Sequence, residues 1–150
     1  MIHSLHRGEF EVSTDPSRLN IGVVHGYLTR SYWAESIPLA VVERSVRNSL
    51  PFGAYRGTDQ AGFARVITDM ATFAYIADVF VLEEFRGRGL GRLLMECIMS
   101  HPGLQGLRRW SLLTRDAHGL YRQFGFAPSG SPERYMEISN PAIYKTGNPR

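Results

Sequence analysis

A glycine-rich turn between a predicted buried strand and a predicted helix constrains this fold more than any other feature of the sequence. Residues 72–82 are apolar without strict alternation, which predicts a central strand buried on both faces. The turn after this strand reads Arg86-Gly87-Arg88-Gly89-Leu90-Gly91-Arg92, and a helix is predicted over residues 89–100. Glycine lets backbone N–H groups approach a ligand closely, and the first N–H groups of a helix have no internal partner. The turn therefore predicts an anion site suited to phosphate.

Two common nucleotide-binding motifs do not fit this turn. The phosphate loop of nucleotide triphosphatases ends in Gly-Lys-Ser/Thr, whereas Arg92 and Leu93 follow Gly91 here. A dinucleotide fingerprint starting at Gly87 requires a small residue where Arg92 stands. It also requires an acidic residue about 20 positions further on, and Asp116 comes too late for that role. Both classes of site are therefore excluded.

The whole sequence predicts one mixed α/β domain over residues 1–150, with a core at about 9–138 and a C-terminal tail at 139–150. Strands are predicted at residues 9–12, 52–56, 62–68, 72–82, 110–113 and 135–138. Helices are predicted from Asp15-Pro16 to about residue 31, and over residues 38–50, 89–100 and 116–124. The three strands between residues 52 and 82 follow one another through short turns, so we expect them to be antiparallel. The strand at 110–113 follows a helix, so we expect it to be parallel to the strand before it.

Composition excludes several classes of protein. No apolar run approaches the ~20 residues of a membrane-spanning helix, and residues 1–12 do not have the pattern of a secretory signal. The single cysteine, Cys97, cannot form an internal disulfide, and the five histidines are scattered, so no metal site is expected. A charged fraction of 21% and an aromatic fraction of 11% indicate a folded chain. The expectation is a soluble cytoplasmic protein with no membrane partner.

Two blocks of the sequence together resemble the GNAT family of N-acetyltransferases. The first block is similar to the acyl-CoA motif of that family and consists of Arg86-x-x-Gly89-x-Gly91, with Val81 before it and Leu93-Leu94-Met95 after it. The second block covers residues 112–126, where a strand and a helix that carries Tyr121 lead to Gly125-Phe126. The resemblance implies the GNAT fold, a mixed and mostly antiparallel central sheet flanked by helices. In that fold two parallel strands splay apart at the coenzyme A site.

The resemblance also implies the activity, an acetyl-CoA-dependent N-acetyltransferase in which a primary amine of a small molecule or peptide attacks the thioester directly. In this family the backbone of the strand before the glycine turn binds the acetyl and pantetheine groups, and the turn binds the pyrophosphate. The matching cofactor positions here are Val79, Phe80, Val81, Arg86, Gly87, Arg88, Gly89, Leu90, Gly91, Arg92, Thr114, His118 and Tyr121. Thr114 stands where many relatives carry an Asn that binds pantetheine. Tyr121 matches the usual general acid, and a phenol with a pKa near ~10 is protonated at neutral pH.

Two aspartates are candidates for the general base, although the family often works through water. Asp69 ends a predicted strand beside a tight turn. Asp78 interrupts an apolar strand, where a carboxylate is costly unless it has a partner, so a structural hydrogen-bonding role is an equal alternative. The aromatic residues expected to bind the acceptor are Tyr27, Tyr32, Trp33, Phe73 and Tyr75. Combined with either aspartate, these rings predict a cationic amine acceptor.

Two other functions remain as alternatives, a non-catalytic acyl-CoA-binding sensor and a nucleic-acid-binding domain. The second is suggested only by the net charge of +3. Residues 85–122 hold seven arginines and two acidic residues, whereas the rest of the chain carries a net charge of −2. The basic excess therefore lies at the two motif blocks, which favours the phosphates of a cofactor over nucleic acid. The sequence leaves open the acceptor, the acyl group and the oligomeric state, for which a homodimer is one option.

Overall fold

Six strands form one sheet in chain order in the computed structural model, which describes residues 1–145. They are β1 (Ser4–Arg7), β2 (Phe10–Ser13), β3 (Leu50–Arg56), β4 (Asp59–Thr68), β5 (Phe73–Val81) and β6 (Arg109–Leu112). Neighbouring strands from β1 to β5 pair antiparallel, and β6 pairs parallel with β5. The expected mixed and mostly antiparallel sheet is therefore confirmed, including the parallel strand that follows a helix.

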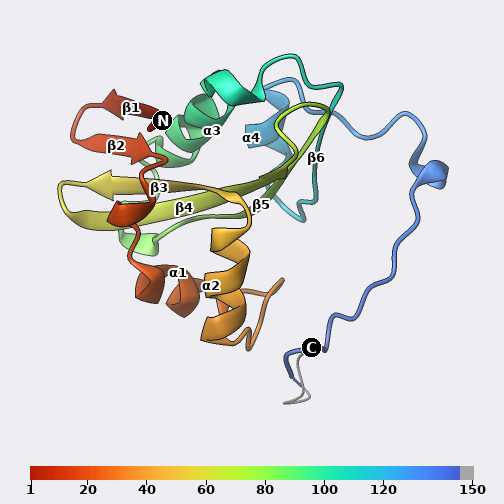
Figure 1. Ribbon diagram of the computed structural model, residues 1–150, viewed down its shortest axis with the longest axis horizontal. Coiled ribbons are helices and arrows are strands. Elements are labelled where there is room, and N and C mark those ends of the chain that lie inside the picture. Colours follow the sequence, from red (N-terminus) through yellow and green to blue (C-terminus); the bar gives the residue numbers. More distant parts are fainter. Residues whose placement is uncertain (146–150) are drawn as a thin grey trace.

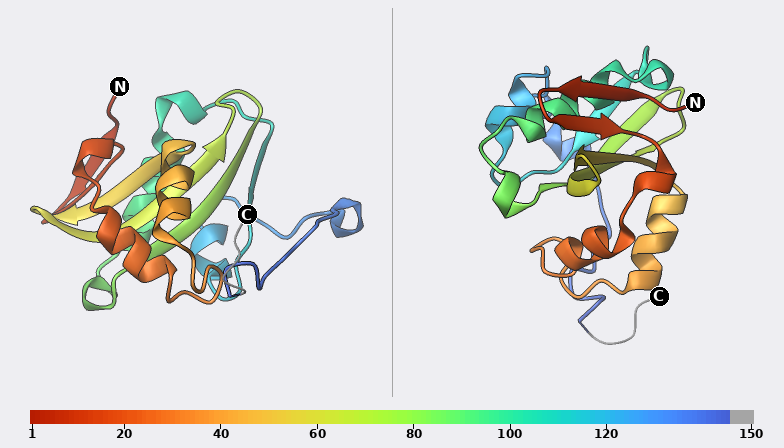
Figure 2. Two further views of the ribbon diagram at one scale, coloured as in Figure 1. Left: turned by 60° about the horizontal axis from the view of Figure 1, so that its bottom comes forward. Right: turned by 90° about the vertical axis from the view of Figure 1, so that its left-hand side faces the viewer.

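Helices cover both faces of this sheet, as Figure 1 shows. They are α1 (Ile21–Leu28), α2 (Leu39–Arg47), α3 (Leu90–Ser100) and α4 (His118–Arg122). Helices α3 and α4 lie on one face, whereas α1 and α2 lie on the other (Figures 1 and 2). This three-layer arrangement buries the sheet on both sides, which explains why β5 is apolar without strict alternation.

Each face of the sheet has its own apolar cluster. Leu94 and Ile98 of α3 are completely buried and belong to the same cluster as Phe52 of β3. On the opposite face, Val24 of α1 and Val42 of α2 are completely buried in a cluster that includes Phe63 and Phe80 of the sheet. Full burial of one side chain of this size contributes about 1.5–3 kcal/mol. The two clusters therefore fix both helical layers, and with them the ends of the strands that form the candidate site.

Helix α1 begins later than the sequence predicts. Asp15 starts only a short 3-10 turn, Pro16–Arg18, in which its carboxylate accepts the Ser17 N–H at 3.0 Å. The α-helix begins at Ile21, where the Asn20 side chain accepts the Val23 N–H at 3.2 Å. An Asp-Pro start signal satisfies the first N–H groups of either kind of helix, so it does not distinguish a single turn from a longer helix. Strand β1 was not predicted, because its four residues are only half-buried or exposed and show no clear alternation.

The strand predicted at residues 135–138 is wrong. This segment is extended but unpaired, and Tyr135, Met136 and Ile138 are all exposed. Strand β6 is therefore an edge strand in the described part of the chain. The segment leaves the sheet and returns on the side of α1 and α2, where Lys145 Nζ lies 2.9 Å from Glu35 Oε2 (Figure 2).

The last residues of the expected tail, 146–150, lie outside the described residues. Within residues 1–145, no helix combines the length and the apolar character that crossing a membrane requires.

Candidate active site

A β-bulge in β5 opens the sheet beside the glycine-rich turn. Between two regular pairs with β4, β5 contains one extra residue in the stretch that includes Asp78 and Val79. Asp78 has a φ of 56°, a left-handed conformation that Asp adopts more readily than most residues. Pairing with β6 ends at Ile76 opposite Leu112, although β5 continues to Val81. The two parallel strands thus separate where the bulge begins, as the resemblance implies, and residues 79–81 have no β6 partner.

The glycine-rich turn presents a row of backbone N–H groups at the start of α3. Gly87 and Gly89 have φ values of 77° and 78°, which favour glycine. Leu93 makes the first backbone hydrogen bond of the helix, to the Gly89 carbonyl at 3.1 Å. Within residues 1–145, no backbone N–H from residue 87 to residue 92 has a partner. A Cβ at Gly87 or Gly89 would meet nothing within 4 Å, so the space before the turn is open and fits a pyrophosphate.

Arg86 holds this turn against the end of β5 and α1. Its Nε donates to the Val81 carbonyl at 3.0 Å, and its Nη2 donates to the Tyr27 hydroxyl at 3.0 Å. The Tyr27 ring in turn stacks on Phe80 at a centroid distance of 4.1 Å and an angle of 8°. The Arg86 side chain is therefore used to fix the turn and an aromatic pair, and its contacts are with the protein itself.

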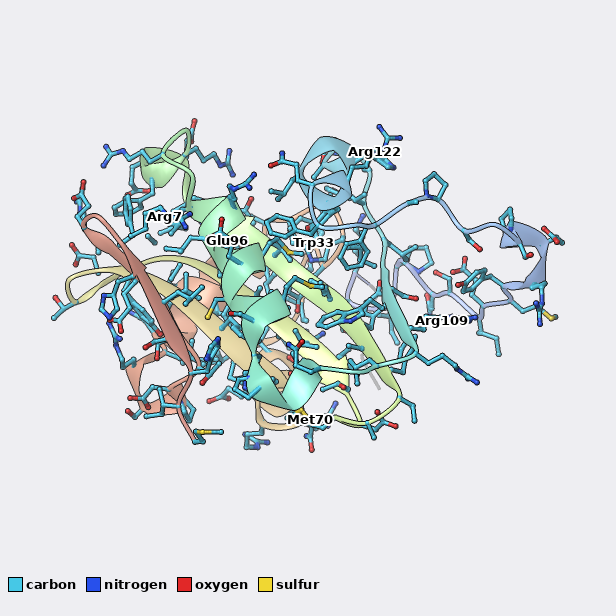
Figure 3. The ribbon with its side chains drawn as sticks, turned by 90° about the horizontal axis from the view of Figure 1, so that it is seen from above. Arg7, Trp33, Met70, Glu96, Arg109 and Arg122 are labelled. Atoms are coloured by element: carbon cyan, nitrogen blue, oxygen red, sulfur yellow. The ribbon has the colours of Figure 1, made fainter. Side chains whose placement is uncertain are left out.

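The other two arginines of the turn have different surroundings. Arg92 Nε donates to Glu96 Oε1 at 3.1 Å, and Arg92 also contacts the Gln123 side chain. Glu96 accepts Arg7 Nη2 at 2.5 Å as well, so β1 is tied to α3 at this point (Figure 3). Arg88 is exposed and has no side-chain partner in the part of the chain that the structure describes. Arg88 is thus the side chain of the turn that is available to an anionic ligand.

An open cleft of about 1190 Å³ joins this turn to the separated ends of β5 and β6. Its lining includes most of the predicted site residues, namely Tyr27, Tyr32, Trp33, Tyr75, Asp78, Val79, Phe80, Val81, Arg86, Gly91, Thr114 and Tyr121. Tyr32 lies edge-on to Trp33 with ring centroids 5.1 Å apart, and the Arg115 guanidinium lies 3.7 Å from the Tyr32 ring centroid. The structure therefore brings the predicted acceptor rings and the predicted acid into one cleft.

Tyr121 lies at the junction of this cleft with a neighbouring groove along β6. Its side chain packs beside Phe126 at a centroid distance of 6.1 Å, and the residue is only 8% exposed. Burial raises the pKa of Tyr121 above its ordinary value of 10.0, and the nearby Tyr32 and Asp116 raise it further. Its hydroxyl has no hydrogen-bond partner within residues 1–145, so its proton is available to a ligand.

Asp78 is bound by two side chains from other parts of the fold. Arg65 Nε of β4 lies 2.6 Å from one carboxylate oxygen, and Trp33 Nε1 donates to the other at 2.9 Å. The side chains of Arg65 and Asp78 are only 16% and 11% exposed. The structural hydrogen-bonding role that the sequence allowed for Asp78 is thus present, and the carboxylate fixes the position of Trp33 at the cleft.

Asp69 lies in the turn between β4 and β5, outside the cleft. It accepts the Ala71 N–H at 3.0 Å, the Thr72 N–H at 2.8 Å and the Thr72 hydroxyl at 2.7 Å. The bonds from Thr72, together with those from Ala71 and Phe73, lower the pKa of Asp69 well below its ordinary value. A carboxylate with these partners stabilises the turn, and it is separate from the residues that line the cleft.

Three other predicted site residues occupy the margins of the cleft. Phe73 and His118 line the neighbouring groove along β6 rather than the cleft itself. Thr114 lines both, and its hydroxyl accepts the Ala117 N–H at 3.0 Å just before α4. The structure therefore separates Phe73 from Tyr27, Tyr32 and Trp33, whereas Tyr75 lines both the groove and the cleft.

Sequence reasoning missed three arginines that line the cleft, Arg30, Arg65 and Arg115. A signal for Arg65 exists in the sequence, because it interrupts an apolar strand in the same way as Asp78. Two opposite charges within neighbouring predicted strands of an antiparallel meander indicate a cross-strand pair. Arg30 carries no such signal, since an arginine after a helix is ordinarily a solvated surface residue.

Comparisons with known proteins agree with this geometry. The family model described as an acetyltransferase (GNAT) domain matches residues 47–128. A protein named "Putative acetyltransferase FG08082" from Gibberella zeae is 35% identical over an alignment of 138 positions, and the match covers 77% of this chain and 77% of that protein. A crystal structure of a "putative acetyltransferase belonging to the gnat family" from Xanthomonas campestris pv. campestris is 51% identical, with a TM-score of 0.89. That match covers 93% of this chain and 99% of the other.

A more distant structure shares the fold. It is a "predicted acetyltransferase with acetyl-CoA" from Clostridium acetobutylicum, which is 12% identical with a TM-score of 0.61 and covers 93% of this chain and 96% of that one. The family model spans more than half of the sequence, and it includes both motif blocks and the bulge in β5. The chain belongs to the GNAT family of acetyltransferases.

Proposed function

We propose that this protein is an acetyl-CoA-dependent N-acetyltransferase in which a primary amine attacks the thioester directly. The observation that carries the proposal is a continuous site. A row of N–H groups at residues 87–92 meets a cleft that contains the Tyr121 hydroxyl, and none of these groups has a partner in the described part of the chain. Membership of the GNAT family supports acyl transfer in general, and the related protein from Clostridium acetobutylicum is described with acetyl-CoA.

The residues of the site fit such a cofactor. The N–H groups of residues 87–92 and the Arg88 guanidinium would hold the pyrophosphate. The backbone of residues 79–81, which β6 leaves unpaired, would hold the pantetheine amides and the acetyl oxygen. Thr114 accepts a hydrogen bond within the protein and keeps its own hydroxyl proton for the cofactor. Bound there, acetyl-CoA supplies a thioester whose acetyl carbon is the electrophile for the amine.

Tyr121 is the general acid in this proposal. The leaving sulfur of the thioester needs a proton, and a phenol whose pKa is raised by burial keeps its proton at neutral pH. Asp78 acts through Trp33 and Arg65, because both of its oxygens already have partners. The amine proton leaves through water, and neither Asp69 nor Asp78 is required as the base.

Cys97 supports the direct transfer over a covalent acyl-enzyme. The residue is completely buried on α3, and burial raises the pKa of its thiol to about 12. A thiol in that state forms almost no thiolate at neutral pH and is not a nucleophile.

Thiol release from acetyl-CoA in the presence of mixed primary amines tests the proposal. The wild-type protein is expected to release coenzyme A, and Tyr121→Phe is expected to lower kcat by about 100-fold while acetyl-CoA affinity stays the same. Tyr55→Phe is the matched control, since Tyr55 is also buried and its hydroxyl also has no partner among residues 1–145, but Tyr55 lies outside the cleft. Binding of acetyl-CoA without thiol release for any amine would instead identify a sensor. Unchanged turnover in Tyr121→Phe would remove Tyr121 from the mechanism.

A further inference from the structure

The part of the cleft that lies away from the glycine-rich turn is positively charged. The whole cleft is lined by Arg30, Arg65, Arg86 and Arg115 together with Asp78 and Asp116, which gives a net charge of +2. Arg86 alone among the four belongs to the turn, so the rest of the cleft carries a net charge of +1. Building on the proposed function, we infer that the acceptor is an amine that also carries an oxyanion, either a carboxylate or a phosphate. Arg65 and Arg30 bind this oxyanion.

Arg65 carries the strongest evidence for such a group. Only its Nε bonds to Asp78, and neither Nη group has a partner within residues 1–145. The side chain is nonetheless only 16% exposed and lines the cleft. Its Nη atoms are not among the fully buried atoms that lack a partner in the described residues, so they remain accessible from the cleft. The planar guanidinium fork matches the geometry of an oxyanion, and the two Nη groups are therefore open donors for such a group.

Arg30 and Arg115 extend this positive region. Both are exposed, both line the cleft, and neither makes an ion pair in the described part of the chain. Arg115 is held over the Tyr32 ring, whereas the Arg30 side chain, just after α1, has no hydrogen bond, ion pair or ring contact within residues 1–145. By contrast, Arg109 on β6 and Arg122 on α4 line the neighbouring groove along β6 and not the cleft. Arg30, Arg65 and Arg115 are thus the arginines that lie with Tyr32 and Trp33 in the cleft.

The position of Arg65 separates this region from the cofactor phosphates. Arg65 pairs with Ala77, four residues before Val81, where β5 ends at the turn. Four residues of fully extended strand span about 13 Å, and the bulge at Asp78 and Val79 makes the actual span shorter. An oxyanion bound by Arg65 would therefore lie on the side of the acceptor rings. The pyrophosphate of the cofactor, which the turn would hold, does not account for the positive charge there.

The same geometry disfavours the cationic acceptor that the aromatic residues and aspartates predict. Asp69 lies outside the cleft, the Asp78 charge is neutralised by Arg65, and the remaining acid, Asp116, is outnumbered by Arg30 and Arg115. Positive surroundings also lower the pKa of an amine, which favours the neutral form that can attack. An amine with a nearby oxyanion therefore fits both the charge and the chemistry of the site.

Matched pairs of acceptors test this inference. Phenylalanine is compared with phenylalaninamide, and O-phosphoethanolamine with ethanolamine, so that each pair differs in the anionic group. The expected result is a kcat/KM at least about 10-fold higher for the anionic member of one pair, equivalent to about 1.4 kcal/mol. The pair that shows the preference distinguishes a carboxylate from a phosphate. Equal or lower kcat/KM for both anionic members, with the neutral members acetylated, overturns the inference and leaves the proposed function intact.

Two variants connect the preference to the arginines. Arg30→Gln removes an exposed guanidinium that has no ion pair within residues 1–145, and it is expected to reduce the preference about 5-fold. Arg47→Gln on α2, outside the cleft, is the matched control. Arg65→Lys keeps a positive charge for Asp78 but loses the planar fork. It should raise KM for the anionic acceptor with little change for the neutral one. A preference that survives both variants overturns the assignment.

A binding measurement separates the proposed function from the proposed oxyanion subsite when no acceptor is acetylated. Calorimetric titration with the same four compounds does not depend on turnover. Tighter binding of an anionic member that is lost in Arg30→Gln supports the subsite even if transfer is absent, in which case only the proposed function fails. Equal binding of both members, or binding of neither, overturns the inference.

Discussion

Replacing Asp78 with Asn tests the central role of the Arg65–Asp78 pair in holding the bulge. Asparagine has nearly the same shape and also adopts left-handed φ values readily, so the conformation at φ 56° is preserved. The substitution therefore removes the negative charge and little else. Its effect measures how much the charge contributes to the stability of the fold.

The magnitude follows from the burial and geometry of the pair. Arg65 Nε and Asp78 Oδ2 are 2.6 Å apart, and the two side chains are 16% and 11% exposed. A hydrogen bond to a charged group contributes about 1.5–3 kcal/mol, against about 1 kcal/mol for a neutral one. Because Arg65 would also keep a partly buried charge without a counter-ion, we expect Asp78→Asn to lower the free energy of unfolding by about 2 kcal/mol. For a domain of this size, that corresponds to a decrease in Tm of about 4–8 °C.

Urea unfolding followed by far-UV circular dichroism measures this difference. Glu35→Gln is the control, because it makes the same change in the Lys145–Glu35 pair, whose side chains are 52% and 54% exposed. An exposed pair contributes no more than about 1 kcal/mol. If Asp78→Asn and Glu35→Gln are equally stable within about 0.5 kcal/mol, the buried pair does not stabilise the bulge and the argument is refuted.

Three further predictions concern other parts of the site. A Cβ at Gly62 would lie 2.7 Å from the Phe80 carbonyl oxygen beside the bulge, so Gly62→Ala is expected to lower the free energy of unfolding by about 1–3 kcal/mol. Gly119→Ala, whose Cβ would enter open space, should leave the stability unchanged or raise it. Equal thermal unfolding midpoints for the two variants would contradict this close approach. Because the pKa of Tyr121 is raised, any loss of kcat due to its deprotonation is expected only above pH 10, and Tyr121→Phe should lack that decrease. A decrease in kcat near pH 8 that Tyr121→Phe abolishes would be inconsistent with the buried phenol. Cys97 is fully buried with a thiol pKa of about 12, so thiol reagents should modify the native protein no faster than it unfolds. Rapid stoichiometric modification would show that the packing of α3 does not protect this thiol.

Local sequence patterns were sufficient for most of the fold. The apolar residues 72–82 and the turn at residues 86–92 predicted the strand, the turn and the helix that the structure contains. Each depends on neighbours in the sequence, namely the burial of a strand and the conformations that glycine allows. The sequence-based predictions were wrong where the same local pattern is compatible with two structures. Asp15-Pro16 begins a 3-10 turn instead of α1, and the segment at 135–138 has strand-like residues but remains unpaired.

The chemistry of the site depends on both the local sequence and the tertiary structure. The sequence by itself determined the glycine-rich turn with its open N–H groups, because the glycines and the first N–H groups of α3 are consecutive residues. It also determined the position of Tyr121 relative to Gly125-Phe126. Only the tertiary structure decided the partners of Asp78, since Arg65 and Trp33 are 13 and 45 residues away along the chain. Those partners neutralise the carboxylate and leave the arginine charges unbalanced, and charge balance in a cleft is set by distances in space that spacing along a sequence does not fix.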